Sequence, residues 1–571
     1  MAYLDFKSEY ERFPKKKLTG YDDHAFNTHD DIIRQINTLN GVIAVETYPG
    51  VNLKHLHDAV LSKTKAKQIH NIENEKKPQK ELDGMLRLFV TDDRVFGRRC
   101  YYEIDDLYDQ DRLEKKTTEI STGGGMRIVY GFGASLIPHD HLIYVDMTRW
   151  EIETRYRAGM PNWTADNPDE DKLRKFKRGY FVEWFLADKL KQRVFETAKY
   201  ILDGNHQETF TMITMEAMQA TLDKLVNEPF RLVPYHDPGV WGGQWMKEVC
   251  NLPENDSNYA WSIDGVPEAN AIRIELGGKD FVFPGTNVVR FRPIKLLGDR
   301  VHGRFGKEFP IRFDFLDTME GQNLSLQVHP LTEYIQDNFG MHYTQDESYY
   351  IMDAADDSSV YIGVREGIDP DKMIADLEAA ERGEITFPDE KYVNRFPAKK
   401  HDHFSLPGGT VHCSGKNTMV LEISTTPYIF TFKLWDWGRL GLDGKPRPVH
   451  VNHGKHVIQF YRDTSWVKDN LINPVSRLSD VEERTGLHER EFLETRRYTF
   501  DRPIETETHG SVNVCNLVEG RAAIIFSPEH AFEPFEVHYA ETFILPENIK
   551  HYGMKPREEG TTCKIIKAFV R

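Results

Sequence analysis

Cysteine is scarce in this sequence. The 571 residues include five cysteines, and no two of them form a Cys-x-x-Cys pair. Because their number is odd and they lie far apart, they exclude a disulfide framework or a cysteine zinc site as the basis of the fold. The five are Cys100, Cys250, Cys413, Cys515 and Cys563.

Long apolar runs and basic blocks are missing too. No apolar stretch reaches the roughly 18 residues that a membrane helix needs, and the opening MAYLDFKSEY lacks the apolar run of a signal peptide. The formal net charge of −17 makes nucleic acid and anionic membranes unfavourable partners. These absences predict a cytoplasmic protein that binds neither.

What the sequence does contain is enough apolar material for packed domains. Hydrophobic residues make up 39% of the chain and aromatic residues 12%, which excludes general disorder. A length of 571 residues is too great for one hydrophobic core. We therefore expect about three domains.

The first third of the chain alternates strand and helix patterns. Gly41–Glu46, Met126–Tyr130 and His141–Asp146 are typical of buried strands, and Tyr180–Leu202 has a long amphipathic helical pattern. Strands that alternate with helices predict βαβ units and a parallel sheet. We expect an α/β domain over residues 1–235.

This α/β domain resembles P-loop nucleoside kinases in layout, with Gly131-x-Gly133 and Asp146 after later strands. A phosphate loop needs G-x-x-x-x-G-K-[ST], whereas residues 46–54 read ETYPGVNLK. We therefore expect a degenerate, non-hydrolysing P-loop. A nucleotide or sugar-phosphate ligand, a regulatory role and a role in assembly, including homo-oligomers, remain open.

The composition shifts around residues 232–239, where we expect a domain boundary, and short alternating strands dominate from Ala271 onward. Their density, with glycine turns, predicts a sandwich or barrel. A helical insert is expected near Asp369 to Arg382. We expect a metal-binding domain over residues 236–463 and a strand-rich domain over 464–571. The predicted strands of the metal-binding domain are Ala271–Glu275, Val288–Phe291, Phe309–Asp314, Tyr349–Met352 and Ser359–Ile362.

Four side chains have the spacing of a metal site. Gln327 and His329 are two apart on a predicted strand and would face the same side. Glu347 opens an aromatic strand eighteen residues after His329, and His412 follows a Pro-Gly-Gly turn. Two imidazoles, a carboxylate and an amide oxygen suit zinc, and also manganese, iron or cobalt.

The same residues resemble type I mannose-6-phosphate isomerases, which belong to the cupin superfamily. The family carries runs like LSLQVHP (residues 324–330), ESYYI (347–351), LPGGTVH (406–412) and LEI (421–423). The order and spacing agree from about Pro238 to Phe460, and the last hundred residues resemble the family's second cupin more loosely. The resemblance implies a mainly-β double cupin, one Zn²⁺ per chain and Gln327, His329, Glu347 and His412 as its ligands.

The resemblance also implies a reaction, the interconversion of mannose 6-phosphate and fructose 6-phosphate or a related pair through an enediolate. Glu422 matches a family carboxylate and is the candidate acid/base, although a strand carboxylate paired with a nearby base is an alternative reading. Arg439 and Lys433 would hold the anionic substrate, and Ser325 would offer its hydroxyl to the phosphate.

The sequence departs from the family at the phosphate site. Gln345 stands where the family usually has a lysine that contacts phosphate, and Lys433 stands where it usually has arginine. A metal-binding sugar sensor without catalysis is therefore an alternative, and an iron cupin oxygenase is a weaker one. The histidines at 450, 453 and 456 are expected to lie in an exposed connection.

Overall fold

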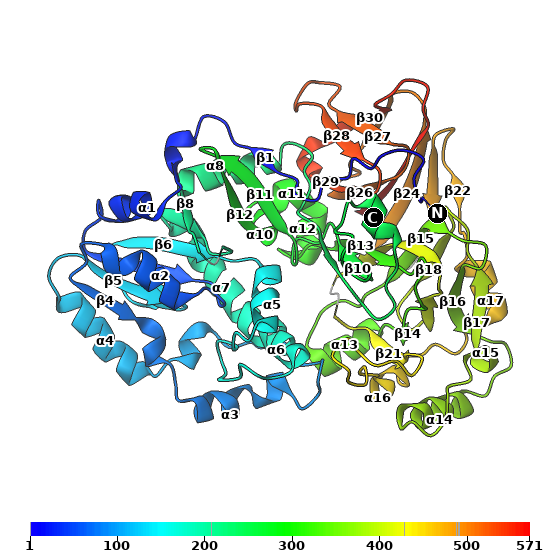
Figure 1. The fold of residues 1–571 in the computed structure, drawn as a ribbon, viewed down its shortest axis with the longest axis horizontal. Coiled ribbons are helices and arrows are strands. Elements are labelled where there is room, and N and C mark those ends of the chain that lie inside the picture. Colours follow the sequence, from blue (N-terminus) through cyan, green and yellow to red (C-terminus); the bar gives the residue numbers. More distant parts are fainter. Residues whose placement is uncertain (1, 207, 427–428, 487, 489–490) are drawn as a thin grey trace. The chain divides into compact units, whose positions relative to one another are not determined.

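A computed structural model describes residues 2–571 except 207, 427–428, 487 and 489–490 (Figure 1). The protein is multidomain and rich in sheets, and it divides into two compact units. We call residues 15–224 with 268–290 the α/β unit, and residues 1–14, 225–267 and 291–571 the β unit. The three-domain division expected from the sequence stays a prediction.

The α/β unit is built on a seven-stranded sheet in the order β2-β8-β7-β6-β3-β5-β4. The five strands from β4 to β7 are parallel, and β8 and β2 add antiparallel pairings at one edge. All residues of β3 and β5 are buried, as expected for strands covered on both faces. The strands are β2 Ala25–Phe26, β3 Val42–Thr47, β4 Gln68–Asn71, β5 Arg127–Gly131, β6 His141–Asp146, β7 Tyr200–Asp203 and β8 Thr211–Thr214.

Helices connect these strands. The predicted helical pattern over Tyr180–Leu202 was wrong at its end, because the α-helix stops at Val194 and Tyr200–Asp203 forms the buried strand β7. The short apolar run of β7 fits either periodicity, and pairing with β6 decides it. The helices are α1 His29–Ile36, α2 Leu53–Ala59, α3 Gln79–Val90, α4 Gln110–Thr122, α5 Arg149–Arg157, α6 Lys172–Arg178, α7 Trp184–Val194 and α8 Met215–Leu225.

A small second sheet completes the α/β unit. It joins β1 (Lys16–Lys17), β11 (Ala271–Leu276) and β12 (Lys279–Pro284) in the order β1-β11-β12. The predicted strand Val288–Phe291 was wrong, because these residues belong to helix α10, Thr286–Phe291. An apolar run of four residues does not distinguish a strand from a buried helical turn.

The β unit begins with two antiparallel sheets. Side chains from both sheets meet in pairs such as His412 with Glu347, so the sheets pack face to face. The six-stranded sheet has the order β18-β15-β20-β13-β10-β9, with β9 Tyr235–Asp237, β10 Trp261–Ile263, β13 Ile311–Asp317, β15 Glu347–Ala354, β18 His403–Leu406 and β20 Thr418–Thr425. The five-stranded sheet has the order β17-β16-β19-β14-β21, with β14 Leu326–Val328, β16 Ser359–Val364, β17 Val393–Pro397, β19 His412–Ser414 and β21 Phe432–Trp435.

Two further antiparallel sheets occupy the last hundred residues and share one apolar core, which includes Tyr498, Leu517 and Met554. One sheet has the order β22-β23-β24-β31-β26-β29 (β22 Ser476–Arg477, β23 Glu482–Thr485, β24 Leu493–Phe500, β26 Asn513–Glu519, β29 Thr542–Leu545, β31 Cys563–Val570). The other has the order β25-β30-β27-β28 (β25 Ile504–Glu507, β27 Ala522–Phe526, β28 Phe535–His538, β30 His551–Pro556).

Several helices join the strands of the β unit. The exposed connection expected around the three histidines holds for His456, which is exposed. It was wrong for His450, which is buried, and for His453, which is half-buried in the short helix α16 with its ring stacked on Phe432. The helices are α9 Trp245–Val249, α11 Pro293–Leu297, α12 Asp299–Phe305, α13 Thr332–Phe339, α14 Pro370–Glu381, α15 Asp389–Tyr392, α16 Val451–Gly454 and α17 Thr464–Asn470.

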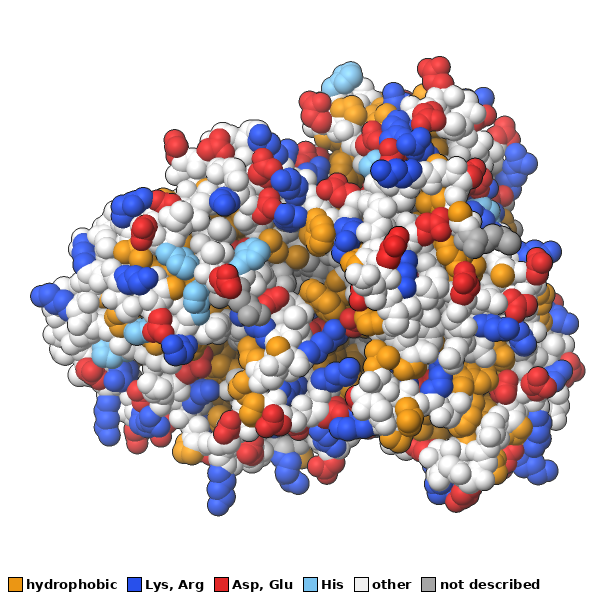
Figure 2. Space-filling model, in the orientation of Figure 1, with side chains coloured by type: hydrophobic (Ala, Val, Ile, Leu, Met, Phe, Trp, Pro, Cys, Tyr) orange, Lys and Arg blue, Asp and Glu red, His pale blue; other side chains and the backbone are white. Residues whose placement is uncertain are grey.

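The composition is reflected in the state of the cysteines, the charges on the surface and the apolar content of the helices. All five cysteines are buried free thiols. In the view of Figure 2, Lys and Arg side chains are interspersed with Asp and Glu side chains. No helix in the described part of the chain combines the length and apolar content that a membrane crossing requires.

Candidate metal centre

Two neighbouring strands of the five-stranded sheet bring the first ligands together. Gln327 of β14 lies opposite His412, the first residue of β19. His329 follows β14 directly, and its carbonyl accepts a hydrogen bond of 2.7 Å from the amide of Gly409. The Pro-Gly-Gly turn before His412 is thereby attached to the end of β14.

Glu347 reaches the same point from the six-stranded sheet, where it is the first residue of β15. Its Oε2 lies 2.9 Å from His329 Nε2, and its Oε1 lies 2.6 Å from His412 Nε2. One ligand atom from each of the three residues lies within 4.8 Å of the others, and all three side chains are buried. The structure therefore assembles a compact His-Glu-His group.

Hydrogen bonds to the far ring nitrogens orient both imidazoles. His329 Nδ1 is 3.1 Å from the carbonyl of Phe430, and His412 Nδ1 is 2.8 Å from that of Thr410. Because a carbonyl only accepts, each Nδ1 carries a hydrogen, which leaves each Nε2 as the ring nitrogen that could bind a metal. This outer contact is the one that metal-binding histidines normally make.

The lone pairs that converge at the centre fit a cation. Within the described part of the chain, His329 Nε2 and Glu347 Oε1 are buried and have no assigned hydrogen bond, although they lie close to other ligand atoms. The amide of Gln327 is 3.2 Å from His412 Nε2, and rotation of that amide would present its oxygen instead. Two imidazoles, a carboxylate and an amide oxygen form a coherent set for a divalent metal.

Glu422 lies beside this group on β20. It is opposite Tyr349 of β15 and Asp314 of β13, and Gln345 Nε2 donates to Glu422 Oε1 at 3.4 Å and to Glu347 Oε2 at 3.1 Å. Burial, together with the nearby Glu347 and Asp314 carboxylates, raises the pKa of Glu422 well above its usual value. A carboxyl group with a raised pKa can exchange protons near neutral pH.

The predicted phosphate contacts gather around Asp436. Ser325 Oγ donates to Asp436 Oδ1 at 3.1 Å, and Arg439 pairs with the same oxygen. Arg447 Nε lies 2.9 Å from Asp436 Oδ2. Lys433 lies on β21 opposite Gln327. Ser325 and Arg439 are thus brought together, but each already binds an acidic residue of the chain.

Three residues that the sequence reasoning did not select also lie near Glu422. Asp314 forms an ion pair of 2.7 Å with Arg312, and burial raises the pKa of Asp314 to about 6. Tyr349 is fully buried, and its ring meets that of His412 edge to face. The period of two along each strand could have found Tyr349, which is two residues after Glu347.

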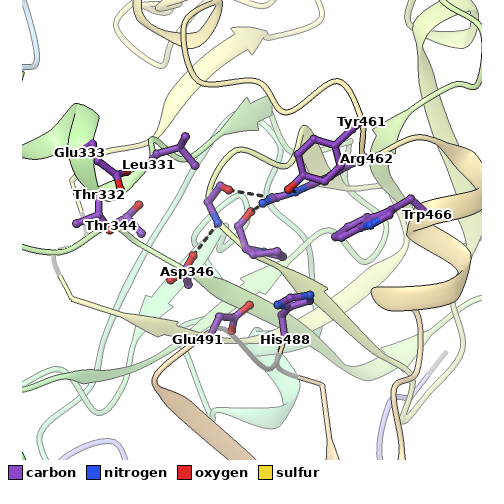
Figure 3. Close-up of a pocket in the computed structure, with 12 residues that line it drawn as sticks. Leu331, Thr332, Glu333, Thr344, Asp346, Tyr461, Arg462, Trp466, His488 and Glu491 are labelled. Carbon is purple, nitrogen blue, oxygen red and sulfur yellow. Dashed lines mark hydrogen bonds between the residues drawn. The ribbon is translucent and has the colours of Figure 1, made fainter.

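A cavity of about 310 Å³ lies next to the loop that precedes His412 (Figure 3). Arg462 forms part of its wall and donates from Nη1 to the carbonyls of Pro407 and Gly408 at 2.7 and 2.8 Å. Asp346 Oδ1 accepts from the Gly408 amide at 2.7 Å. These contacts hold the loop from both sides and so position His412.

Comparisons with known proteins place the two parts of the chain differently. Residues 28–227 match a domain of unknown function, DUF8485. The chain is 30% identical over 240 residues to mannose-6-phosphate isomerase ManA of Bacillus subtilis, a match that covers 41% of this chain and 69% of ManA. It is 24% identical over 237 residues to mannose-6-phosphate isomerase of Streptococcus mutans, covering 40% of this chain and 68% of that enzyme.

One solved structure with a similar chain course is that of mannose 6-phosphate isomerase from Bacillus subtilis. It is 18% identical, and the match covers 60% of this chain and 99% of that one with a TM-score of 0.47.

Proposed function

The chain belongs to the mannose-6-phosphate isomerase family, and from this premise we propose that it interconverts mannose 6-phosphate and fructose 6-phosphate. The chain is an isomerase, as its curated relatives are. The observation that carries the specific proposal is the buried His329-Glu347-His412 group with Glu422 beside it. Because Gln345 and Lys433 differ from the residues that the family usually has at the phosphate site, a related sugar phosphate is the alternative substrate.

We propose Zn²⁺ as the metal, held by Gln327, His329, Glu347 and His412. Manganese, iron or cobalt would accept the same ligands. When bound, such an ion supplies Lewis-acid stabilisation of negative charge on neighbouring substrate oxygens. The orientation of both imidazoles by backbone carbonyls supports this ligand set.

Glu422 is our candidate for the group that moves the proton between C1 and C2. As a carboxylate it would take the proton from one carbon, leaving an enediolate, and as the acid it would return the proton to the other. Gln345 supports this role because its amide holds Glu422 and Glu347 in one arrangement. Tyr349 and Asp314 close the surroundings of Glu422, so that bulk water has little access.

The phosphate would be held by Arg439, Lys433 and Ser325. Asp436 competes for two of these groups, since it binds both Ser325 and Arg439. A phosphate clamp therefore requires Arg439 to exchange Asp436 for the substrate. The neutral Gln345 adds no cation, so affinity for phosphate rests on fewer charges than the family's usual lysine would provide.

A coupled assay of the zinc-reconstituted chain with mannose 6-phosphate, following fructose 6-phosphate, tests the proposal. We expect turnover by the wild-type protein that is absent in His412→Ala. Treatment with a chelator should abolish the turnover of the wild-type protein, and added zinc should restore it. The absence of turnover in protein shown to hold one metal per chain would overturn the substrate assignment. It would favour another sugar or a sensor role without catalysis.

A further inference from the structure

A second cavity, of about 350 Å³, lies within the α/β unit at the carboxyl end of β3. The loop that leaves β3 forms one wall, with Thr47, Tyr48 and Gly50. The sheet neighbours of β3 are β5 on one side and β6 on the other. From β3 the chain continues to β4 and β5 on one side of β3 and then crosses to β6 on the other side. In open parallel sheets, this position outside the carboxyl ends of the central strands is where ligands bind.

Acidic residues that could hold a metal–phosphate complex at this edge are already engaged. Asp146, at the end of β6, receives Lys191 Nζ at 2.7 Å on each carboxylate oxygen, and Asn287 Nδ2 donates to its Oδ2 at 2.8 Å. Asp146 and Lys191 are both almost completely buried. A buried carboxylate neutralised by a lysine has no free charge for a magnesium ion.

The loop after β3, residues 48–52, contains no lysine or arginine. The nearest lysine along the chain, Lys54 in the first turn of α2, pairs with Asp58 at 2.5 Å, and its side chain is 87% exposed. The ionisable groups of opposite sign that line the cavity are two carboxylates, Glu73 and Asp166, and one ammonium group, Lys76. Such a lining disfavours a triphosphate or a sugar phosphate, because it would place two like charges beside the anion.

The lining suits a ligand that is polar but uncharged. Lys76 Nζ lies 4.4 Å from the centre of the Trp163 ring and donates to the Trp163 carbonyl at 2.9 Å. Glu73 accepts from the Phe132 amide at 3.1 Å and lies 4.0 Å from Lys76. The charged pair thus offers both a donor and an acceptor. Apolar and aromatic side chains supply the other walls: Tyr48, Val51, Leu53, Tyr156, Met160, Pro161 and Trp163.

Aromatic and apolar walls with a few fixed polar groups are the usual make-up of a small-molecule site. A sugar ring presents apolar C–H faces to such walls and hydroxyl groups to a carboxylate and an ammonium group. We propose that this cavity of the α/β unit binds an uncharged monosaccharide, with Glu73 and Lys76 as its polar anchors and Trp163 as part of its wall. This inference does not depend on the isomerase activity of the β unit.

Isothermal titration and saturation-transfer NMR on the full chain test it. The protein carries His412→Ala throughout, so that sugar binding at the metal centre is removed from the signal. The probes are neutral hexoses and pentoses, with mannose 6-phosphate and magnesium-ATP for comparison. Glu73→Gln and Trp163→Ala are introduced in this background, and Glu114→Gln, at an exposed position of α4, is the matched control.

We expect at least one neutral sugar to bind, and its Kd to rise about tenfold or more in Glu73→Gln, since a hydrogen bond to a charged group is lost. The control should retain the Kd of the His412→Ala parent, and the phosphorylated probes should bind at least about tenfold more weakly than the neutral sugar. If Trp163→Ala does not fold, the nearly isosteric Glu73→Gln decides alone. The proposal is overturned if no neutral sugar binds, if a phosphorylated probe binds more tightly, or if Glu73→Gln leaves the Kd unchanged.

Discussion

The amide of Gly409 donates a hydrogen bond of 2.7 Å to the carbonyl of His329, which joins the turn before one candidate metal ligand to the strand that ends in another. Gly409 has a φ of +89°, in the region that favours glycine. A Cβ atom at this position would lie 2.5 Å from Gln459 Cγ and 2.9 Å from the carbonyl oxygen of Val457. Both the backbone conformation and the crowding therefore require glycine.

Gly409→Ala should lower the free energy of unfolding by about 3 kcal/mol, as the sum of left-handed strain and overpacking. It should also reduce bound metal, because the turn positions His412. Denaturant unfolding and metal analysis measure the two effects. Gly444→Ala is the matched control, since Gly444 has a φ of +73° but nothing within 4 Å of its added Cβ. Equal losses in both variants would show that the crowding at Gly409 is unimportant.

Glu422→Gln should lower kcat for the isomerisation by about 100-fold or more, because the amide cannot take up the proton. Metal content should not change, since Glu422 is outside the proposed ligand set. Steady-state kinetics and metal analysis on the same preparation separate the two roles. Glu505→Gln, a carboxylate on the surface strand β25, is the control. A wild-type kcat in Glu422→Gln would remove this residue from the proton transfer.

Gln345→Lys should lower the KM for mannose 6-phosphate by up to about tenfold, because it restores a cation where the family has one. The preference for the phosphorylated sugar over mannose, as a ratio of kcat/KM values, should rise in parallel. Gln336→Lys, on the exposed face of α13, makes the same charge change away from the centre. An unchanged KM would indicate that the phosphate does not approach position 345.

The stability of the β unit should fall in acid partly through His403. This side chain is fully buried between Ser348 Oγ at 2.9 Å and Thr485 Oγ1 at 3.0 Å, and burial lowers its pKa to about 3. Below about pH 6.5 the His403 imidazole therefore binds a proton in the unfolded chain but not in the folded chain. Stability from this residue is complete above pH 6.5 and is lost progressively as the pH falls towards 3.

In the wild type, His403 should make the free energy of unfolding fall by up to about 1.4 kcal/mol per pH unit between pH 6 and 4. His403→Gln should remove this contribution. Urea unfolding followed by tryptophan fluorescence at a series of pH values provides the measurement. His551→Gln, at a more exposed histidine, is the control. An identical pH dependence in wild type and His403→Gln would mean that His403 is protonated in the folded chain.

The sequence predicted well the buried strands that have a continuous apolar run between polar residues. His141–Asp146 was expected as a strand and forms β6 with the same bounds, because the run Leu142–Val145 is typical of a strand covered on both faces. Val288–Phe291 and Tyr200–Asp203 are too short for periodicity to decide, and their tertiary partners determine the outcome.

The candidate site shows the same division. The spacing and family resemblance selected Gln327, His329, Glu347 and His412, and the structure brings them together. Asp436 could not have been chosen, since its contact with Ser325 spans 111 positions in the sequence. Such long-range pairings depend on sheet register, which local pattern does not specify.

The division of the chain into units has a consequence for biosynthesis. The α/β unit takes residues 15–224 and then 268–290, and the β unit takes the first fourteen residues together with segments on both sides of the second stretch. A ribosome releases the chain from the amino end, so β1 must wait for β11, more than 250 residues later, before its sheet can form. For the amino-terminal arm, Asp264, the partner of the Tyr10 hydroxyl, is synthesised shortly before β11, whereas Glu541, the partner of the Glu11 amide, is synthesised only near the end of the chain. Translation speed between residues 224 and 291 should therefore influence the yield of native protein more than the same change elsewhere.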